Sequence, residues 1–461
     1  MTSHEVDVVV VGLGPGGEDL AARLARAGLD VVGVERRLVG GECPYWGCIP
    51  SKMVIRAADS IAETRRTPRI GGAVTVEPDF GLVATRIRDE ATTNWDDTVA
   101  ADRLTDSGAT LVRGDARLDG PRTVVVGDDR YVARKGVVLN TGTRPARLPI
   151  DGLEGTPYWT NHEILETTTA PASLAVIGGG PIGAELAQAF SRFGTTVHVI
   201  EHGPRIVGPE EPEASAVLTE VFEREGITIH TDAETQRVEH SEADGFTIHL
   251  GDGTIRVEQL LVAAGRTSNL DDLGLETVGV EAGGKSVPVD DHMRVADGLW
   301  AIGDVAGKGA FTHVSMYQSA IAYRDIVGED GPPADYRALP HVTFTDPEIG
   351  SVGMTEKSAR DAGLRIRVGV TDLSASSRGF VHGPGNDGVI KVVEDADRGV
   401  LVGATAVGPS GGEILGALAI AVRGEVPVAT LQHSIWAYPT FHRAIESALA
   451  DLHDPDEEQS A

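Results

Sequence analysis

Two widely separated stretches of the chain share one pattern of apolar runs and glycines. In the first, the apolar run Val6–Val11 leads into the glycine-rich turn Gly12–Gly17 and a helical pattern that reaches Gly28. A second apolar run, Asp30–Val34, then stops at the acidic residue Glu35. This order predicts a unit of strand, turn, helix and strand.

The later stretch repeats this unit. Leu174–Ile177 is the first apolar run, Gly178–Gly183 the turn, and the helical pattern ends near Gly194. The second run ends at Ile200 and is followed by Glu201. In both copies the acid comes 23 residues after the first glycine of the turn. Matching flanks and spacing make each copy a predicted dinucleotide-binding unit.

Each glycine of these turns has a separate physical role. The first permits a tight turn, the second lets the backbone approach a pyrophosphate, and the third allows close packing of the helix. The three are Gly12, Gly14 and Gly17 in the first copy and Gly178, Gly180 and Gly183 in the second. Glu35 and Glu201 are placed to accept hydrogen bonds from a ribose diol.

Further strands end in small or acidic residues. The run 136–139 precedes Thr141 and Gly142, the run 259–264 precedes Gly265, and the run 299–303 precedes Asp304. From Tyr336 onward the pattern is of α+β type. Strands are predicted at Gly388–Val393 and Gly399–Ala404, and helices at Glu413–Arg423 and His442–Ala450.

The predicted fold class is therefore α/β, with two Rossmann-like dinucleotide-binding domains followed by a C-terminal α+β domain. We expect residues 1–150 and 271–335 to form the first nucleotide-binding domain and its continuation. Residues 151–270 form the second nucleotide-binding domain and residues 336–461 the C-terminal domain. A chain of 461 residues is long enough for three such cores.

Composition and charge limit the kinds of binding partner that we expect. The chain is 41% hydrophobic and 24% charged, with a formal net charge of −29. So acidic a chain repels phosphate backbones and anionic lipid, so we expect neither nucleic acid nor membrane partners. The first residues lack a signal-peptide pattern and no apolar run is long enough to span a bilayer, so we predict a cytoplasmic protein without a metal site.

The only two cysteines, Cys43 and Cys48, lie close together directly after the first unit. One pair in 461 residues is no disulfide framework. In a cytoplasmic protein a lone pair beside a predicted cofactor site is better interpreted as a redox switch. The alternative is two unreactive buried cysteines.

With this pair, the order of motifs resembles the FAD-dependent pyridine nucleotide–disulfide oxidoreductases, the group of dihydrolipoamide dehydrogenase, glutathione reductase and mercuric reductase. The resemblance extends from Val6 to about Leu449, and its most specific segment is Gly40–Lys52. Two supporting segments are Gly303–Val305 and Thr345–Glu356, the second resembling the start of the family's interface domain.

The resemblance implies cofactors and roles. FAD would occupy the first unit, with Glu35 on the adenosine ribose and Asp304 on the ribityl chain. NAD(P)H would occupy the second unit. Thr141, Gly142 and Gly265 are the further residues that we expect at the cofactors. An acid at position 201 repels a 2′-phosphate and favours NADH, whereas the nearby His202 and Arg205 leave NADPH as an alternative.

The same resemblance makes Cys43 the exchange thiol that meets substrate and Cys48 the charge-transfer thiolate. Because the segment after Gly47 opens a helix, its N-terminus would stabilise a thiolate there. Lys52 and Glu185 match a lysine–glutamate pair that lies at the flavin's hydride-accepting edge in the family. A cation there favours reduced flavin and orients the nicotinamide. The plain alternative is a solvated lysine and an ordinary helix glutamate.

The chain departs from the family near its C-terminus. The family's disulfide reductases have a histidine before Pro-Thr and a glutamate after it, and here Tyr438 and Arg443 stand in those places. A phenol is a poor base at neutral pH, so oxidation of a dithiol should be impaired. His442, spaced to meet Glu446 on a helix face, is a candidate replacement base or an ordinary surface histidine. We expect His433 and His313 to be structural.

The resemblance implies a homodimeric enzyme that passes hydride from NAD(P)H through flavin to a Cys43–Cys48 disulfide and on to a disulfide or thiol substrate. Tyr438 would act as proton donor, reaching the site from the other subunit. The alternatives are a quinone or metal-ion reductase of the same family and a flavin redox sensor with low turnover. The aromatic residues Tyr45 and Trp46 either stack on a planar acceptor or fill core.

Overall fold

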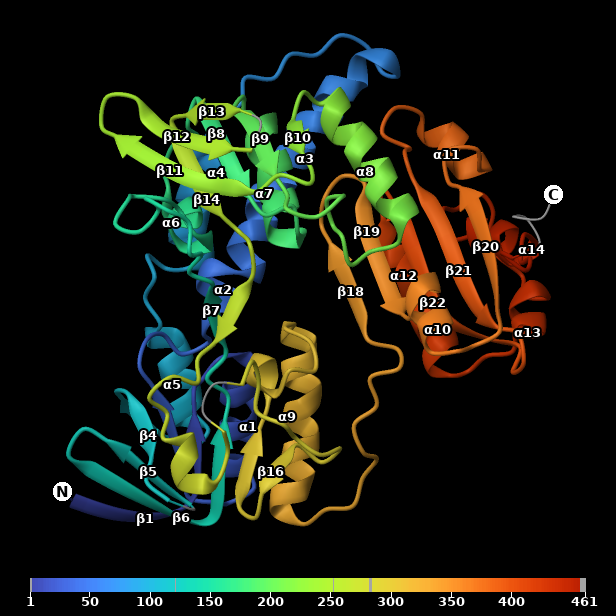
Figure 1. The fold of residues 1–461 in the computed structure, drawn as a ribbon. Helices are drawn as coiled ribbons and strands as arrows, with labels where there is room; N and C mark the ends of the chain where they lie inside the picture. Colours follow the sequence, from blue (N-terminus) through green and yellow to red (C-terminus); the bar gives the residue numbers. More distant parts are fainter. Residues whose placement is uncertain (1, 121, 252, 282–283, 457–461) are drawn as a thin grey trace. The chain divides into compact units, whose positions relative to one another are not determined.

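The computed structural model describes residues 2–120, 122–251, 253–281 and 284–456, and the chain divides into two compact units (Figure 1). The first unit is built from Met1–Pro50, Thr85–Ala146 and Gly265–Asp335. The second is built from Ser51–Ala84, Arg147–Ala264 and Tyr336–Ala461. Both units are therefore assembled from segments that are distant in sequence.

An eight-stranded sheet forms the centre of the first unit, with the path β16-β17-β6-β1-β2-β3 and with β5 joining β4 to β6. Its strands are β1 (Thr2–Val11), β2 (Val31–Glu35), β3 (Thr110–Arg113), β4 (Ala116–Leu118), β5 (Thr123–Val126), β6 (Asp129–Leu139), β16 (Arg294–Ala296) and β17 (Leu299–Ala301). A short ladder pairs β7 (Thr143–Pro145) with β15 (Arg266–Ser268). The helical elements are α1 (Pro15–Arg26), α2 (Glu42–Trp46), the start of α3 (Cys48–Arg66), η2 (Ile87–Ala91), α5 (Thr98–Asp106), η3 (Leu275–Val278), η4 (Gly303–Ala306) and α9 (Thr312–Val327).

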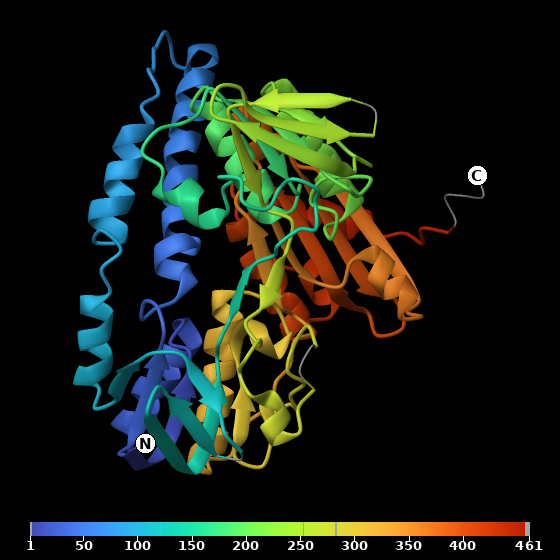
Figure 2. The ribbon, with the colours of Figure 1, turned by 60° about the vertical axis from the view of Figure 1, so that its left-hand side comes forward.

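The second unit holds three sheets. The parallel sheet is β10-β9-β8-β14, formed by β8 (Ser173–Ile177), β9 (Thr196–Ile200), β10 (Thr228–His230) and β14 (Gln259–Val262). An antiparallel sheet, yellow-green in Figure 2, comprises β11 (Thr235–Ser241), β12 (Gly245–Leu250) and β13 (Thr254–Val257). The C-terminal sheet β18-β19-β22-β21-β20 comprises β18 (Pro340–Thr343), β19 (Glu348–Gly353), β20 (Ile366–Asp372), β21 (Val389–Asp395) and β22 (Val400–Gly408).

The helices of the second unit cover these sheets. They are the rest of α3, η1 (Thr67–Arg69), α4 (Phe80–Arg86), α6 (Asn161–Glu166), α7 (Pro181–Arg192), α8 (Pro212–Arg224), α10 (Glu356–Asp361), α11 (Ser377–His382), α12 (Gly411–Arg423), α13 (Val428–Gln432) and α14 (Ala444–Ala450). α12 and α14 pack on the C-terminal sheet, where Leu415, Leu418 and Leu449 join the buried core.

The sequence repeat is also a repeat of topology. In the first unit the parallel strands run β6-β1-β2-β3, and in the second they run β14-β8-β9-β10. In each case the strand before the glycine-rich turn lies in the centre, and the strand that follows its helix pairs directly with it. A turn between such strands lies at the carboxyl edge of the sheet, where doubly wound folds bind ligands.

Close backbone approach explains the glycines of both turns. Gly12 has a positive φ of 90°, and a Cβ there would collide with the carbonyl of Asn140. Gly178 has a φ of 106°, and its Cβ would meet the carbonyl of Ala263. α1 and α7 each begin after a glycine that offers no side-chain cap, so their first amides face the turn without an internal acceptor from that residue.

The predicted elements are present, with shifted ends. The strand expected at Val6 begins at Thr2, and the helix expected from Glu413 begins at Gly411. The helix expected from His442 begins only at Ala444, because Pro439 and Thr440 hold the preceding residues in an irregular loop. The sequence patterns did not predict the antiparallel sheet β11–β13. The predicted division into three domains, the first formed by residues 1–150 and 271–335, remains a prediction.

None of the helices within the described ranges is both long and apolar enough to cross a membrane.

Candidate functional site

The two cysteines lie in the first unit, one in the short helix α2 and the other at the start of the next helix, α3. Cys43 is in α2 and is half-buried, whereas Cys48 is the first residue of α3 and is exposed. Both are free thiols, and a hydrogen bond from Cys43 to Cys48 raises the pKa of the Cys43 thiol, with burial adding to the effect. When the pair loses one proton, the charge therefore rests on Cys48, at the helix N-terminus that stabilises it.

Thr312 is a candidate site residue that the sequence patterns missed. Its Oγ1 lies 3.4 Å from the Sγ of Cys48, and its hydroxyl also contacts the thiol of Cys43. Thr312 begins α9, more than 260 residues beyond the cysteines. No local pattern links the two segments, so this contact was visible only in the folded chain. A hydroxyl here can donate to whichever sulfur carries the charge.

The acids at the ends of β2 and β9 hold the glycine-rich turns by identical hydrogen bonds. The carboxylate of Glu35 accepts from the backbone amides of Leu13 and Arg37, both at 2.8 Å. That of Glu201 accepts from Gly179 and Gly203, both at 2.7 Å. Each acid therefore shapes its turn in addition to facing the expected ribose. Each oxygen keeps a second lone pair for such a ligand.

The first turn shows the signs of a cofactor cradle. The hydroxyl of Thr141 is buried, directly beside Gly12, and has no hydrogen-bond partner among the described residues. A buried polar atom of this kind calls for a partner, and a bound ligand can supply it. The carbonyls of Thr141 and Gly142 are held by Asn269 at 2.9 Å each. These residues fit FAD.

Asp304 is oriented by a chain of hydrogen bonds. Its carboxylate accepts from the hydroxyl of Thr143 at 2.6 Å, and that hydroxyl accepts from Arg266 at 2.7 Å. Arg266 also lies 3.7 Å from Glu42, the neighbour of Cys43. Gly265 accepts the amide of Ala146 through its carbonyl and has a φ of 98°. This polar chain links the predicted ribityl contact to the cysteine segment.

Lys52 and Glu185 are brought together in the second unit. Their side chains form an ion pair of 2.7 Å, in which Glu185 is buried and Lys52 is 35% exposed. The second oxygen of Glu185 accepts the amide of Phe344 at 2.8 Å, and the Lys52 ammonium lies 4.7 Å from the Phe344 ring centroid. The pairing agrees with the sequence expectation, while its catalytic role stays a prediction.

Tyr438 and Arg443, which the sequence leads us to expect in the places of a histidine and a glutamate, contact each other. The Arg443 guanidinium lies 5.6 Å from the centroid of the Tyr438 ring, a cation–π distance. It also donates to the carbonyl of Trp436 at 3.1 Å and pairs with Glu446 at 2.8 Å. Tyr438 is 68% exposed. The two substitutions therefore form one unit on the surface.

The candidate base His442 is not paired with Glu446 as its spacing suggested. α14 begins after His442, so the two residues do not share a helix face, and Glu446 pairs with Arg443. The His442 ring instead lies 5.9 Å from Trp436 and 3.4 Å from the hydroxyl of Thr440. The expected His442–Glu446 pair is thus wrong.

The remaining aromatic and histidine candidates have structural contacts. Tyr45 is buried, donates its hydroxyl to the carbonyl of Val39 at 3.1 Å, and has a pKa that burial raises to about 12. It fills core. His433 contacts the carbonyl of Ala429 within its own turn, and the His313 ring stacks on Phe311.

An open surface pocket of about 580 Å³ is lined in part by residues on either side of Tyr438. Its walls are mostly apolar, with one arginine, one glutamate and one histidine among them. They comprise Arg378, Ser410, Glu413, Ile414, Ala417, Trp436, Pro439, Thr440, Phe441 and His442. The loop that carries Tyr438 therefore borders a space of ligand size.

Comparison with known proteins decides the family. Residues 6–319 match the model of the pyridine nucleotide-disulphide oxidoreductases, and residues 339–449 match that family's dimerisation domain. The chain belongs to the pyridine nucleotide-disulphide oxidoreductase family. The predicted family and fold class are confirmed, and with them the broad class of enzyme, an oxidoreductase acting on disulfides. Membership implies FAD and a pyridine nucleotide.

Family members with similar sequences include two kinds of enzyme. A dihydrolipoyl dehydrogenase of Chlorobaculum tepidum is 33% identical over 458 residues, which cover 97% of each chain. A mercuric reductase of Acidithiobacillus ferrooxidans is 31% identical and is matched over 96% of this chain and 82% of its own length. Among solved structures, the Cu(II) complex of the flavoprotein disulfide reductase RclA from Escherichia coli has a TM-score of 0.86 at 25% identity, covering 97% of this chain and 99% of its own.

Proposed function

We propose that this oxidoreductase uses NAD(P)H to reduce a disulfide or related thiol compound through the Cys43–Cys48 pair. The observation that carries the proposal is the contact of the two thiols, with the proton held on Cys43. The residues around Thr141 would hold FAD, which supplies a two-electron carrier between nicotinamide and disulfide. Glu35 and Asp304 would hold its ribose and ribityl groups.

The electrons and protons balance as follows. The hydride equivalent from NAD(P)H amounts to two electrons and one proton. The electrons break the Cys43–Cys48 S–S bond, and the proton leaves Cys43 as thiol and Cys48 as thiolate. Cys43 then loses its proton and attacks a substrate disulfide, releasing the first substrate thiol with that proton. Attack by Cys48 on Cys43 re-forms the enzyme disulfide and releases the second substrate sulfur, which takes up a solvent proton. Hydroxyl donation from Thr312 favours the charged sulfur at each stage.

Disulfide participation predicts the reducing capacity of the holoenzyme. Anaerobic titration with NADH should place four electrons on each subunit, two in the flavin and two in the opened disulfide. Cys48→Ser should hold two, because it has no disulfide to open. Two electrons in the wild type would instead favour a flavin-only reductase.

The Tyr438–Arg443 unit supports reduction rather than dithiol oxidation. A phenol can donate a proton but is a poor base at neutral pH, and its neighbour is a cation instead of an orienting carboxylate. The natural direction would therefore be consumption of NAD(P)H. In this proposal Tyr438 reaches the active site of the other subunit, so its role requires the dimer.

Restoring the family's pair should reverse this preference. Tyr438→His combined with Arg443→Glu should raise dihydrolipoamide oxidation by more than tenfold, since general base catalysis contributes roughly 10²–10⁴-fold. Tyr438→His alone should gain less, because Arg443 then faces the imidazole without orienting it. His433→Gln serves as the control. Equal rates in wild type and double variant, at equal FAD content, would show that this unit does not limit thiol oxidation.

A quinone or metal ion is the second candidate acceptor. The mostly apolar pocket beside the Tyr438 loop, with Trp436 and Phe441 in its wall, has the character of a site for a planar ring. For metal ions, the support is that RclA was solved as a Cu(II) complex and that mercuric reductases are relatives. A flavin redox sensor with low turnover is the third candidate function. The cytoplasmic location stays a prediction.

NADH is the preferred donor in this proposal. Glu201 would repel a 2′-phosphate, and the Arg205 guanidinium donates to the carbonyls of Gly208 and Glu210. Of the two basic residues that left NADPH as an alternative, His202 and Arg205, the second thus donates within its own loop.

Accordingly, kcat/KM should be at least about tenfold higher with NADH than with NADPH, since an unfavourable charge contact costs on the order of 1.4 kcal/mol or more. Arg205→Gln should leave this ratio unchanged. A selective loss of NADPH use in Arg205→Gln would instead place its guanidinium on the 2′-phosphate and contradict the assignment.

The active form proposed is a homodimer. Residues 339–449 match a dimerisation domain, and this segment exposes large apolar side chains. These are Phe380, Val381, Ile420 and Ile435. Sedimentation should give twice the chain mass, and Ile420→Asp should shift the protein toward monomer and lower disulfide reduction. An active monomer would contradict the proposal.

A further inference from the structure

Two helices of the second unit face each other with charges at matched spacing. Lys52 and Asp59 on α3 are seven residues apart, as are Glu185 and Arg192 on α7. Lys52 pairs with Glu185 at 2.7 Å, and Asp59 pairs with Arg192 at 2.6 Å. Seven residues make nearly two helical turns, so each pair of charges lies on one face. The helices are therefore joined by a two-rung charge ladder.

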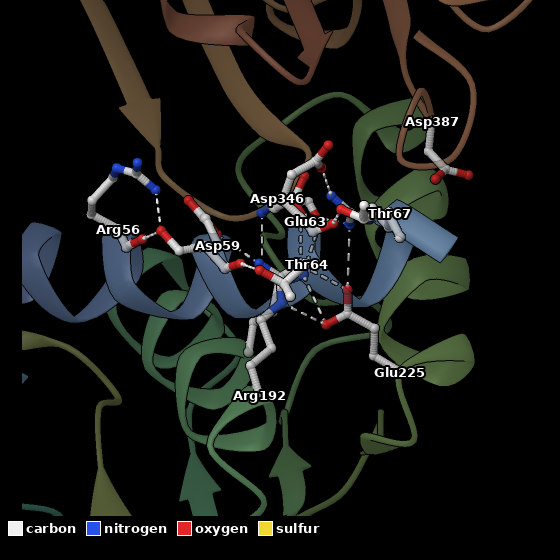
Figure 3. Close-up of polar contacts among 12 residues, drawn as sticks. Arg56, Asp59, Glu63, Thr64, Thr67, Arg192, Glu225, Asp346 and Asp387 are labelled. Atoms are coloured by element: carbon white, nitrogen blue, oxygen red, sulfur yellow. Dashed lines mark hydrogen bonds and ion pairs between the residues drawn. The ribbon is translucent and has the colours of Figure 1, made fainter. Parts of the chain in front are cut away.

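The ladder continues into a cluster at the end of α3, drawn in Figure 3. Arg66, seven residues beyond Asp59, donates to Asp346 at 2.6 Å, and Arg192 reaches the same carboxylate at 2.7 Å. Arg192 also pairs with Glu225 at 2.7 Å. One buried guanidinium thus joins α3, α7, the end of α8 and the loop before β19.

The loop before β19 is fixed to the same stripe of α7. The amide of Phe344 donates to Glu185, and the side chain of Gln188 both donates to and accepts from the backbone of Asp346, at 2.7 and 2.8 Å. Glu185, Gln188 and Arg192 are all at most 5% exposed. Each polar group of this stripe has a defined partner, as buried polar groups require.

Charge balance makes Asp59 the weakest member. The guanidinium groups of Arg66 and Arg192 face four carboxylates, those of Asp59, Glu63, Glu225 and Asp346, so with every carboxylate ionised the cluster carries two excess negative charges. Burial raises the pKa of Asp59 to about 7 despite the attraction of Arg192, and Asp346 and Glu348 add to the rise. Asp59 can therefore be altered while Arg192 keeps two other partners.

The ladder sets the register of α3 against α7. Sliding or rolling α3 would separate both rungs together, taking one of three carboxylates from Arg192 and leaving the buried carboxylate of Glu185 without its cation, which is strongly unfavourable. We propose that Asp59 and Arg192 are positioning residues that hold the ammonium of Lys52 against Glu185 for hydride transfer. The inference rests on the proposed role of the Lys52–Glu185 pair and extends it by two residues that do not contact it.

The test measures the rate of flavin reduction by NADH in the holoenzyme, in a stopped-flow experiment without acceptor. Lys52→Met should slow this rate at least about tenfold, and Asp59→Ala should slow it about tenfold with little change in the KM for NADH, because small misplacements of an orienting group cost this much or more. Arg56→Gln, on the exposed side of α3, should stay within about twofold of wild type. Asp59→Asn, of nearly equal volume, tests the charge alone.

The decisive arm is the double variant. If Asp59 acts through Lys52, Asp59→Ala should add less than about twofold in the Lys52→Met background, since the ammonium that it positions is gone. Effects that multiply, or an Asp59→Ala variant as mild as Arg56→Gln, would overturn the ladder while leaving the lysine's role intact. Full rate in Lys52→Met would contradict the role of the pair itself, and the inference with it.

Discussion

The chemistry of this chain depends on a contact between two sulfur atoms that compete for one proton. The hydrogen bond from Cys43 to Cys48 raises the pKa of Cys43, so the thiol and the thiolate of the reduced pair differ in position and in charge. This asymmetry allows the two sulfurs different roles. The sulfur of Cys43 can be exchanged with a substrate, and that of Cys48 remains at the N-terminus of α3. The hydroxyl of Thr312, from a helix distant in sequence, contacts both sulfurs and can donate a hydrogen bond to whichever one is charged.

The chain uses one nucleotide-binding design twice. Both glycine-rich turns occupy the same place in a four-strand parallel order, and both are clamped by a glutamate at the end of the neighbouring strand. The clamp explains why the acid recurs at a constant distance from the first glycine: its carboxylate must reach a backbone amide of the turn. The spacing between glycine and glutamate is therefore set by backbone geometry.

Local patterns were enough to predict both turns, their flanking strands and the cysteine segment, because glycine spacing and apolar runs depend on near neighbours. They failed where the decisive contact is distant. The ladder charges are regularly spaced on α3 and α7. The partners in each rung are 133 residues apart in sequence, so the pairing could be recognised only once the fold brought the two helices together. His442 was assigned to the wrong neighbour because an irregular loop, rather than a helix, precedes Ala444. Tyr438 was identified by position, whereas its contact with Arg443 required the structure.

The proposed function requires that electrons from a nicotinamide open the Cys43–Cys48 disulfide bond. The most direct measurement is alkylation of the holoenzyme with a heavy-isotope reagent after one equivalent of NADH under argon, then peptide mass mapping of residues 43 and 48. We expect the reagent on these cysteines only after NADH, with the untreated enzyme showing the two peptides joined by a disulfide. Equal labelling before and after NADH would mean that the pair does not take part in electron transfer, and the account would fail.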